Sequence, residues 1–116
     1  MDYEEFVSRK LTRDPPTGIA CEVETHKSLF PFQHDIVRWA LRRGRSAVFA
    51  DTGLGKTRMQ LAWADAVRRH TARKVLILAP LAVAQQTAAE GRDMGMIVTV
   101  CRDANDVQHG INVTNY

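Results

Sequence analysis

The amino-acid sequence predicts an α/β fold in which helices flank a parallel sheet of about four strands. Three apolar runs of strand length, 46–50, 74–79 and 96–101, alternate with segments whose apolar residues recur at helical spacing. This alternation is typical of parallel sheets built from strand–helix–strand units. A glycine-rich turn also separates the first apolar run from the helical segment behind it. The 116 residues are enough for one domain with a modest core.

The N-terminal part, 1–28, is expected to hold a short amphipathic helix over 2–11 and a linker. Pro15, Pro16 and Gly18 break the helical pattern there. The sheet domain is expected to span 29–116 and to begin with a helix from Gln33 to Arg43, which Gly44 stops. Three arginines cluster where this helix ends, and they fit either a solvated helix end or a contact with a phosphate backbone: Arg42, Arg43 and Arg45.

The remaining elements follow from the pattern in order. A buried strand is expected over 46–50, and a helix from Lys56 to about His70, with one apolar face. That face consists of Met59, Ala62, Trp63, Ala66 and Val67. The continuous apolar run 74–79 predicts a parallel strand covered on both faces. A helix over 82–90 that ends near Gly91, a strand over 96–101 and a short fourth strand over 110–115 complete the prediction.

Composition excludes several classes of protein. The net charge of +3 is mildly basic, and Cys21 and Cys101 stand in no spacing typical of metal sites, so we expect two reduced thiols. The four histidines form no cluster with these cysteines. No apolar run approaches the roughly 20 residues that a membrane span needs. We therefore expect a soluble, cytoplasmic protein without a zinc site.

The stretch from Ala50 to Thr57, Ala-Asp-Thr-Gly-Leu-Gly-Lys-Thr, carries the chemistry. A glycine-rich turn at the start of a helix points several backbone N–H groups into one concavity, which suits a phosphate. Lys56 is then placed to reach the terminal phosphates, and the Thr57 hydroxyl is placed to ligate Mg²⁺. The predicted phosphate site consists of Thr52, Gly53, Leu54, Gly55, Lys56 and Thr57. The alternative is an ordinary glycine turn.

Three stretches in this order resemble the first motor domain of superfamily-two helicases, in particular the Swi/Snf-like helicases found in phages and prophages. They are Leu29–Gln33, the Walker A-like loop Ala50–Thr57, and Leu76–Leu81. The phosphate loop of that family commonly begins with Ala, as it does at Ala50. The resemblance covers 29–116 and implies a partial RecA-like P-loop domain that binds ATP and Mg²⁺ and works on DNA.

The resemblance also implies roles for single residues. Gln33 matches the glutamine that recognises adenine, with Phe30 or Phe32 as a contact to the ring. A loop at the end of a strand that in the family lies along nucleic acid is matched by Ala79, Pro80 and Leu81. Each has a simpler alternative, since Gln33 fits a cap on backbone groups and Pro80 fits the end of a strand.

The chain lacks the acids that hydrolysis of ATP requires. No Asp-Glu dipeptide occurs in it, and Asp103 is best interpreted as a loop acid. The resemblance implies a domain truncated before the Asp-Glu motif, whose sheet has a gap or an exposed hydrophobic edge. We therefore expect nucleotide binding without steady hydrolysis, and no catalytic residue.

Two other functions stay open at this stage. The chain fits a stand-alone, helicase-derived phage protein that binds and inhibits a host partner, for example an anti-CRISPR or other anti-defence inhibitor without enzymatic activity. It also fits a nucleic-acid-binding module that uses no nucleotide. A protein partner or a second copy of the chain is a further expectation, because either would cover the incomplete sheet.

Overall fold

The computed structural model describes residues 16–20, 23–49 and 55–115. This part of the chain confirms the α/β class, with three parallel strands rather than four. The predicted helix over 2–11 lies outside the described residues. The elements, in order, are α2 (Pro31–Arg43), α3 (Lys56–Thr71), β1 (Val75–Leu78), α4 (Leu81–Asp93), β2 (Val98–Val100), the 3-10 turn η1 (Ala104–Asp106) and β3 (Ile111–Thr114).

The strands lie in the order β1-β3-β2, and both pairings are parallel. Val75 of β1 and Val98 of β2 both stand opposite Ile111, so the register of the whole sheet is set by β3. The strand that comes last in the sequence is therefore the central one.

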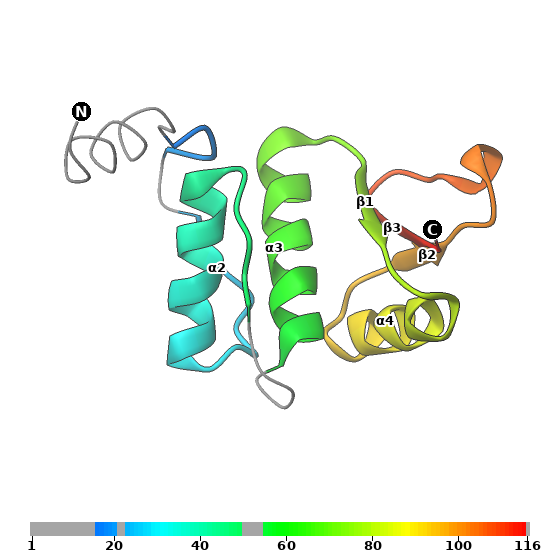
Figure 1. The fold of residues 1–116 in the computed structure, drawn as a ribbon, viewed down its shortest axis with the longest axis horizontal. Helices are drawn as coiled ribbons and strands as arrows, with labels where there is room; N and C mark the ends of the chain where they lie inside the picture. The colour runs from blue at the N-terminus through cyan, green and yellow to red at the C-terminus, as the bar shows by residue number, and fades with distance from the viewer. Residues whose placement is uncertain (1–15, 21–22, 50–54, 116) are drawn as a thin grey trace, which may run out of the picture.

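Helix α3 occupies the middle of the molecule, between α2 and the sheet (Figure 1). This position explains why it is buried on more than the one predicted face. Met59 and Ala62 of the predicted stripe are buried, and so are Leu61 and Ala64, each with 0 % of its surface exposed. Val75, Ile77, Ile111 and Val113 on one face of the sheet join the same core.

The predicted strand over 46–50 is wrong for the residues that the structure describes. Residues 46–49 belong to no strand, and Phe49 is 97 % exposed. A strand forms only where a neighbour supplies hydrogen bonds, and in the described sheet β1 pairs with β3 alone. The apolar run 46–49 therefore has no place in the described sheet.

The prediction that β1 is covered on both faces is also wrong. Its side chains alternate, with Val75 and Ile77 buried against the helices and Leu76 and Leu78 55 % and 57 % exposed. All three helices of the described chain contribute to the core on the other side of the sheet. This exposed apolar surface lies on a face of β1 rather than at its edge, so the expected hydrophobic edge stays a prediction.

Helix α4 continues to Asp93, two residues past the predicted stop at Gly91. Gly91 is an internal, buried residue of the helix. A Cβ atom at Gly91 would lie 2.5 Å from Cγ2 of Val98, so the missing side chain lets β2 approach the helix. The glycine serves packing rather than helix termination. No helix that the structure describes is long and apolar enough to cross a membrane.

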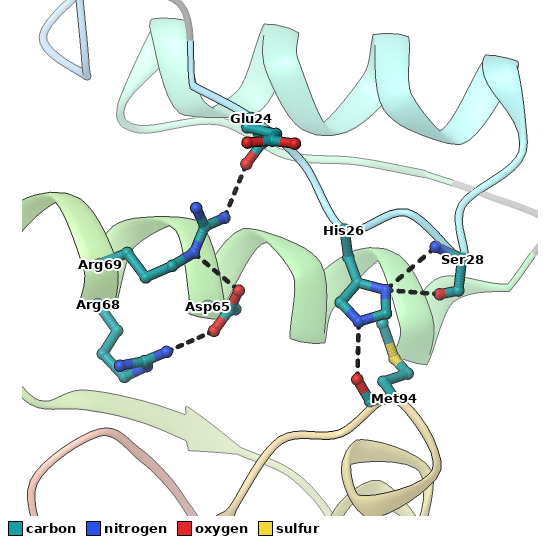
Figure 2. Close-up of polar contacts among 7 residues, drawn as sticks. All are labelled: Glu24, His26, Ser28, Asp65, Arg68, Arg69 and Met94. Atoms are coloured by element: carbon teal, nitrogen blue, oxygen red, sulfur yellow. Dashed lines mark hydrogen bonds and ion pairs between the residues drawn. The ribbon is translucent and has the colours of Figure 1, made fainter.

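The segment before α2 is bonded to all three helices. The backbone N–H groups of Thr17, Gly18 and Ile19 donate to the carbonyls of Arg43, Arg42 and Leu41 at the end of α2. Further along, Nη2 of Arg69 donates to the Glu24 carbonyl, and Nε2 of His26 donates to the Met94 carbonyl behind α4 (Figure 2). The side chain of Thr25 is hydrogen-bonded to His34 of α2.

Asn112 holds the loop between β2 and β3 against the face of the sheet that the helices leave open. The side chain is fully buried, and it donates to the Gln108 carbonyl and accepts from the Gln108 N–H, both at 2.9 Å. A buried amide is stable only with such partners. This closed pair of hydrogen bonds explains a buried polar residue in the central strand.

Candidate functional site

The candidate site lies where α2 and α3 begin, at the end of the molecule toward which the parallel strands run (Figure 1). Helix α3 starts at Lys56, and its N-cap residue, Gly55, has left-handed backbone angles (φ 75°, ψ 41°). The first N–H groups of a helix have no carbonyl partner within it, and the helix dipole adds positive potential there. The first turn of α3 carries no acidic residue, so an anion meets no repulsion from it.

Gln33 contacts this turn although it is 22 residues away in sequence. Its side chain is only 4 % exposed. A Cβ atom at Gly55 would lie 2.4 Å from Nε2 of Gln33, so the amide occupies the space that a larger residue would need. The structure thus brings the predicted adenine-binding residue against the predicted phosphate-binding turn.

The other end of the Gln33 amide has a structural role. Oε1 of Gln33 accepts a hydrogen bond of 2.9 Å from the backbone N–H of Phe30 at the start of α2. The alternative of a backbone cap is therefore confirmed, and the contact with adenine stays a prediction. The rings of Phe30 and Phe32 stack beside it, with centroids 6.4 Å apart, and both are exposed.

A cavity of about 420 Å³ lies between α2 and α3. Among the described residues that line it, Lys56 is the one lysine, and Ser46 and Gln60 add polar groups. The remaining lining residues are Ile36, Val37, Ala40, Gly44, Val48, Met59 and Trp63. A mainly apolar hollow with a few polar groups is the usual form of a small-molecule site. Apart from Lys56, sequence reasoning missed these residues as site candidates, because α2 and α3 meet only in the folded chain.

The structure places the predicted phosphate site only in part. Thr52, Gly53 and Leu54 are outside the described residues. Thr57 is the second residue of α3 and is half-buried. The described residues contain no group of three or more His, Cys, Asp or Glu side chains that could hold a metal ion.

The predicted nucleic-acid loop is at the carboxyl end of β1. Ala79 is buried and its N–H donates to the Thr114 carbonyl, Pro80 is the N-cap of α4, and Leu81 is 67 % exposed. Pro80 thus follows the end of β1, which confirms the simpler interpretation that this proline ends a strand. Asp103 lies in the loop behind β2, where its carboxylate accepts from the Asn105 N–H at 2.8 Å, as a loop acid should.

Cys101 is buried and free of disulfides. Burial raises the pKa of its thiol above the ordinary 9.0, and the carboxylates of Asp106 and Asp103 add to the rise. A thiol with a raised pKa stays protonated at neutral pH and is a poor nucleophile. It donates weakly to Oδ1 of Asn112, at 3.6 Å, so its role is to support the loop.

No protein-family model and no curated protein matches the chain. A functional proposal therefore rests on the geometry of the candidate site.

Proposed function

We propose that this chain is an ATP-binding domain of the helicase-like motor type that does not hydrolyse ATP by itself. The observation that carries the proposal is the contact between the Gln33 amide and Gly55, which joins a candidate base-binding side chain to a candidate phosphate-binding turn. Both lie outside the carboxyl ends of a parallel sheet, where ligands of α/β proteins usually bind.

The residues present fit a nucleoside triphosphate. Gly55 has the left-handed backbone that glycine adopts at little cost, and its missing side chain leaves room for the Gln33 amide. The proposed roles are phosphate binding by the N–H groups of the first turn and by Lys56, and coordination of Mg²⁺ by Thr57. Bound Mg²⁺ would neutralise charge on the phosphates. The sequence provides no Asp-Glu pair to complete its coordination or to orient water, so the expected activity is binding alone.

Thermal unfolding with and without Mg²⁺ and ATP tests the proposal. ATP at about 100 times its dissociation constant adds roughly 2.7 kcal/mol to the free energy of unfolding, which raises the Tm of a domain of this size by several degrees. Lys56→Ala should abolish most of this rise. Lys74→Ala, which removes the exposed lysine that follows α3 at the opposite end of that helix, should retain it.

Phosphate release should stay at the background rate in the same samples. The absence of a Tm rise in the unmodified protein would contradict the proposal, as would an equal rise in the protein and in Lys56→Ala.

A second candidate function is supported by a different observation, the exposed face of β1. Leu76 and Leu78 present apolar surface that a partner would cover, as expected for a helicase-derived protein that docks on another protein and inhibits it. The two functions differ in their response to Lys56→Ala. That change should leave partner binding intact if the chain acts by docking.

A further inference from the structure

Helices α2 and α3 finish at the end of the molecule opposite the candidate nucleotide site (Figure 1). Several residues at and just after these two helix ends are exposed or half-exposed cations. We call this group the basic end. It consists of Arg42, Arg45, Arg68, Arg69, Arg73 and Lys74.

The fold brings these residues together from two helices and the start of β1. Helices α2 and α3 pack side by side and end at the same end of the molecule (Figure 1). Gly44, between Arg42 and Arg45, lines the same cavity as Trp63 of α3. Lys74 directly precedes β1, which starts at this end.

Few described charges oppose this group. Asp65 is paired with both Arg68 and Arg69, at 2.7 and 2.9 Å, and Glu24 lies beside Arg69 (Figure 2). Two helix ends contribute about half a negative charge each. The six positive charges of the basic end are thus opposed by two carboxylates and by about one negative charge from the two helix ends. About three positive charges remain, as many as the net charge of the whole chain.

The simpler explanation, that arginines only complement a helix end, does not account for the surplus. The positive charges of Arg42 in the last turn of α2 and Arg45 just after it exceed the partial negative charge of that helix end. Arg73 and Lys74, just after α3, do the same at the end of α3. Arg42, Arg45 and Arg73 are exposed, and none forms an ion pair with a described residue. Their guanidinium groups are free to bind an outside anion.

We propose that the basic end binds the phosphodiester backbone of a nucleic acid. Five of its six cations are arginines, whose planar groups bind phosphate oxygens in pairs. The cations are spread over an open surface rather than enclosed in a pocket, which favours an extended polyanion over a small phosphate. This surface differs from the Ala79–Leu81 loop, because Lys74 precedes β1 and Pro80 follows it. The inference does not depend on nucleotide binding.

Binding of a fluorescent 20-base-pair DNA duplex, measured by anisotropy over a range of NaCl concentrations without nucleotide, tests this proposal. Each phosphate contact contributes about 0.9 to the slope of log K against log salt. The variant Arg42→Gln/Arg45→Gln/Arg73→Gln should lower the slope by about 2 to 3 and weaken binding at least about tenfold.

The control variant is Lys27→Gln/Arg92→Gln/Arg102→Gln, which removes three exposed cations remote from the basic end. It should bind DNA like the unmodified protein. Duplex RNA should bind with a similar slope, since the backbone chemistry is shared. Circular dichroism should show that both triple variants remain folded, as expected for changes at exposed positions.

Three results would overturn the proposal. One is a wild-type slope below about 1, which means fewer than two phosphate contacts. Another is an equal loss of binding in the control variant. The last is competition by polyglutamate at the same charge concentration as DNA, which would assign the surface to acidic proteins.

Discussion

Gly55 is the residue on which the candidate site depends most. It combines a positive φ with a side chain, Gln33, that already fills the position of its missing Cβ. The positive φ alone, or the occupied Cβ position alone, would already favour glycine over other residues here. Together they link the geometry of the turn to the placement of a buried amide on another helix.

We predict that Gly55→Ala lowers the free energy of unfolding by more than the backbone conformation alone requires. A left-handed alanine costs about 1–2 kcal/mol, and displacement of the Gln33 amide would add to this. The control is Gly95→Ala, because Gly95 has a similar φ of +80° but open space around its Cα. Urea unfolding of both variants measures the difference. Equal losses would mean that Gln33 does not occupy the space beside Gly55.

At the scale of elements, the end of α2 is completed by residues far ahead of it in the sequence. The carbonyls of Leu41, Arg42 and Arg43 accept hydrogen bonds from the N–H groups of residues 17–19. A Cβ atom at Gly18 would lie 1.9 Å from the Leu41 carbonyl oxygen, and neither backbone could yield cheaply.

We therefore predict that Gly18→Ala separates this segment from α2. Loss of three backbone hydrogen bonds, at about 1 kcal/mol each, should lower the free energy of unfolding by up to about 3 kcal/mol. Hydrogen exchange at the amides of residues 17–19 should become much faster, whereas Ala20→Ser, at an exposed position, should leave it unchanged. Protection that survives in Gly18→Ala would contradict this contact.

The elements show what sequence patterns can and cannot predict. Helix α3 was predicted almost to its ends, since apolar spacing and a preceding glycine are local properties. The strand over 46–50 was predicted wrongly, because an apolar run says nothing about whether a neighbouring strand is present. Gly91 was misread as a stop, because its role depends on Val98 of another element.

The same division holds for the candidate site. Motif spacing and a family resemblance proposed Gln33, Gly55 and Lys56 as site candidates one by one. Their contact, the cavity beside them and the basic end arise from the packing of α2 on α3, which no local pattern encodes.

On the scale of the whole molecule, the helices that the structure describes cover the sheet on one side only. We predict that the isolated chain self-associates through the other face, where Leu76 and Leu78 are more than half exposed. Leu76→Lys/Leu78→Lys should weaken the association at least about tenfold, since each leucine buries apolar surface worth about 1 kcal/mol or more. Sedimentation velocity over a range of concentrations measures this.

The matched control is Ala82→Lys/Ala89→Lys, which adds the same charge at exposed positions of α4. It should associate like the unmodified chain. A protein that remains monomeric at all concentrations, or a control that dissociates equally, would count against association through this face.

The central position of β3 has a consequence for synthesis on the ribosome. Strands β1 and β2 share no hydrogen bond, and both pair only with residues 111–114. While the chain is being made, at about 5–20 residues per second, β1 and β2 therefore cannot form the described sheet before β3 has been synthesised. The helical pair α2 and α3 is able to form beforehand, but the nascent chain keeps Val75, Ile77 and Val98 without their sheet partners until translation of this region is complete.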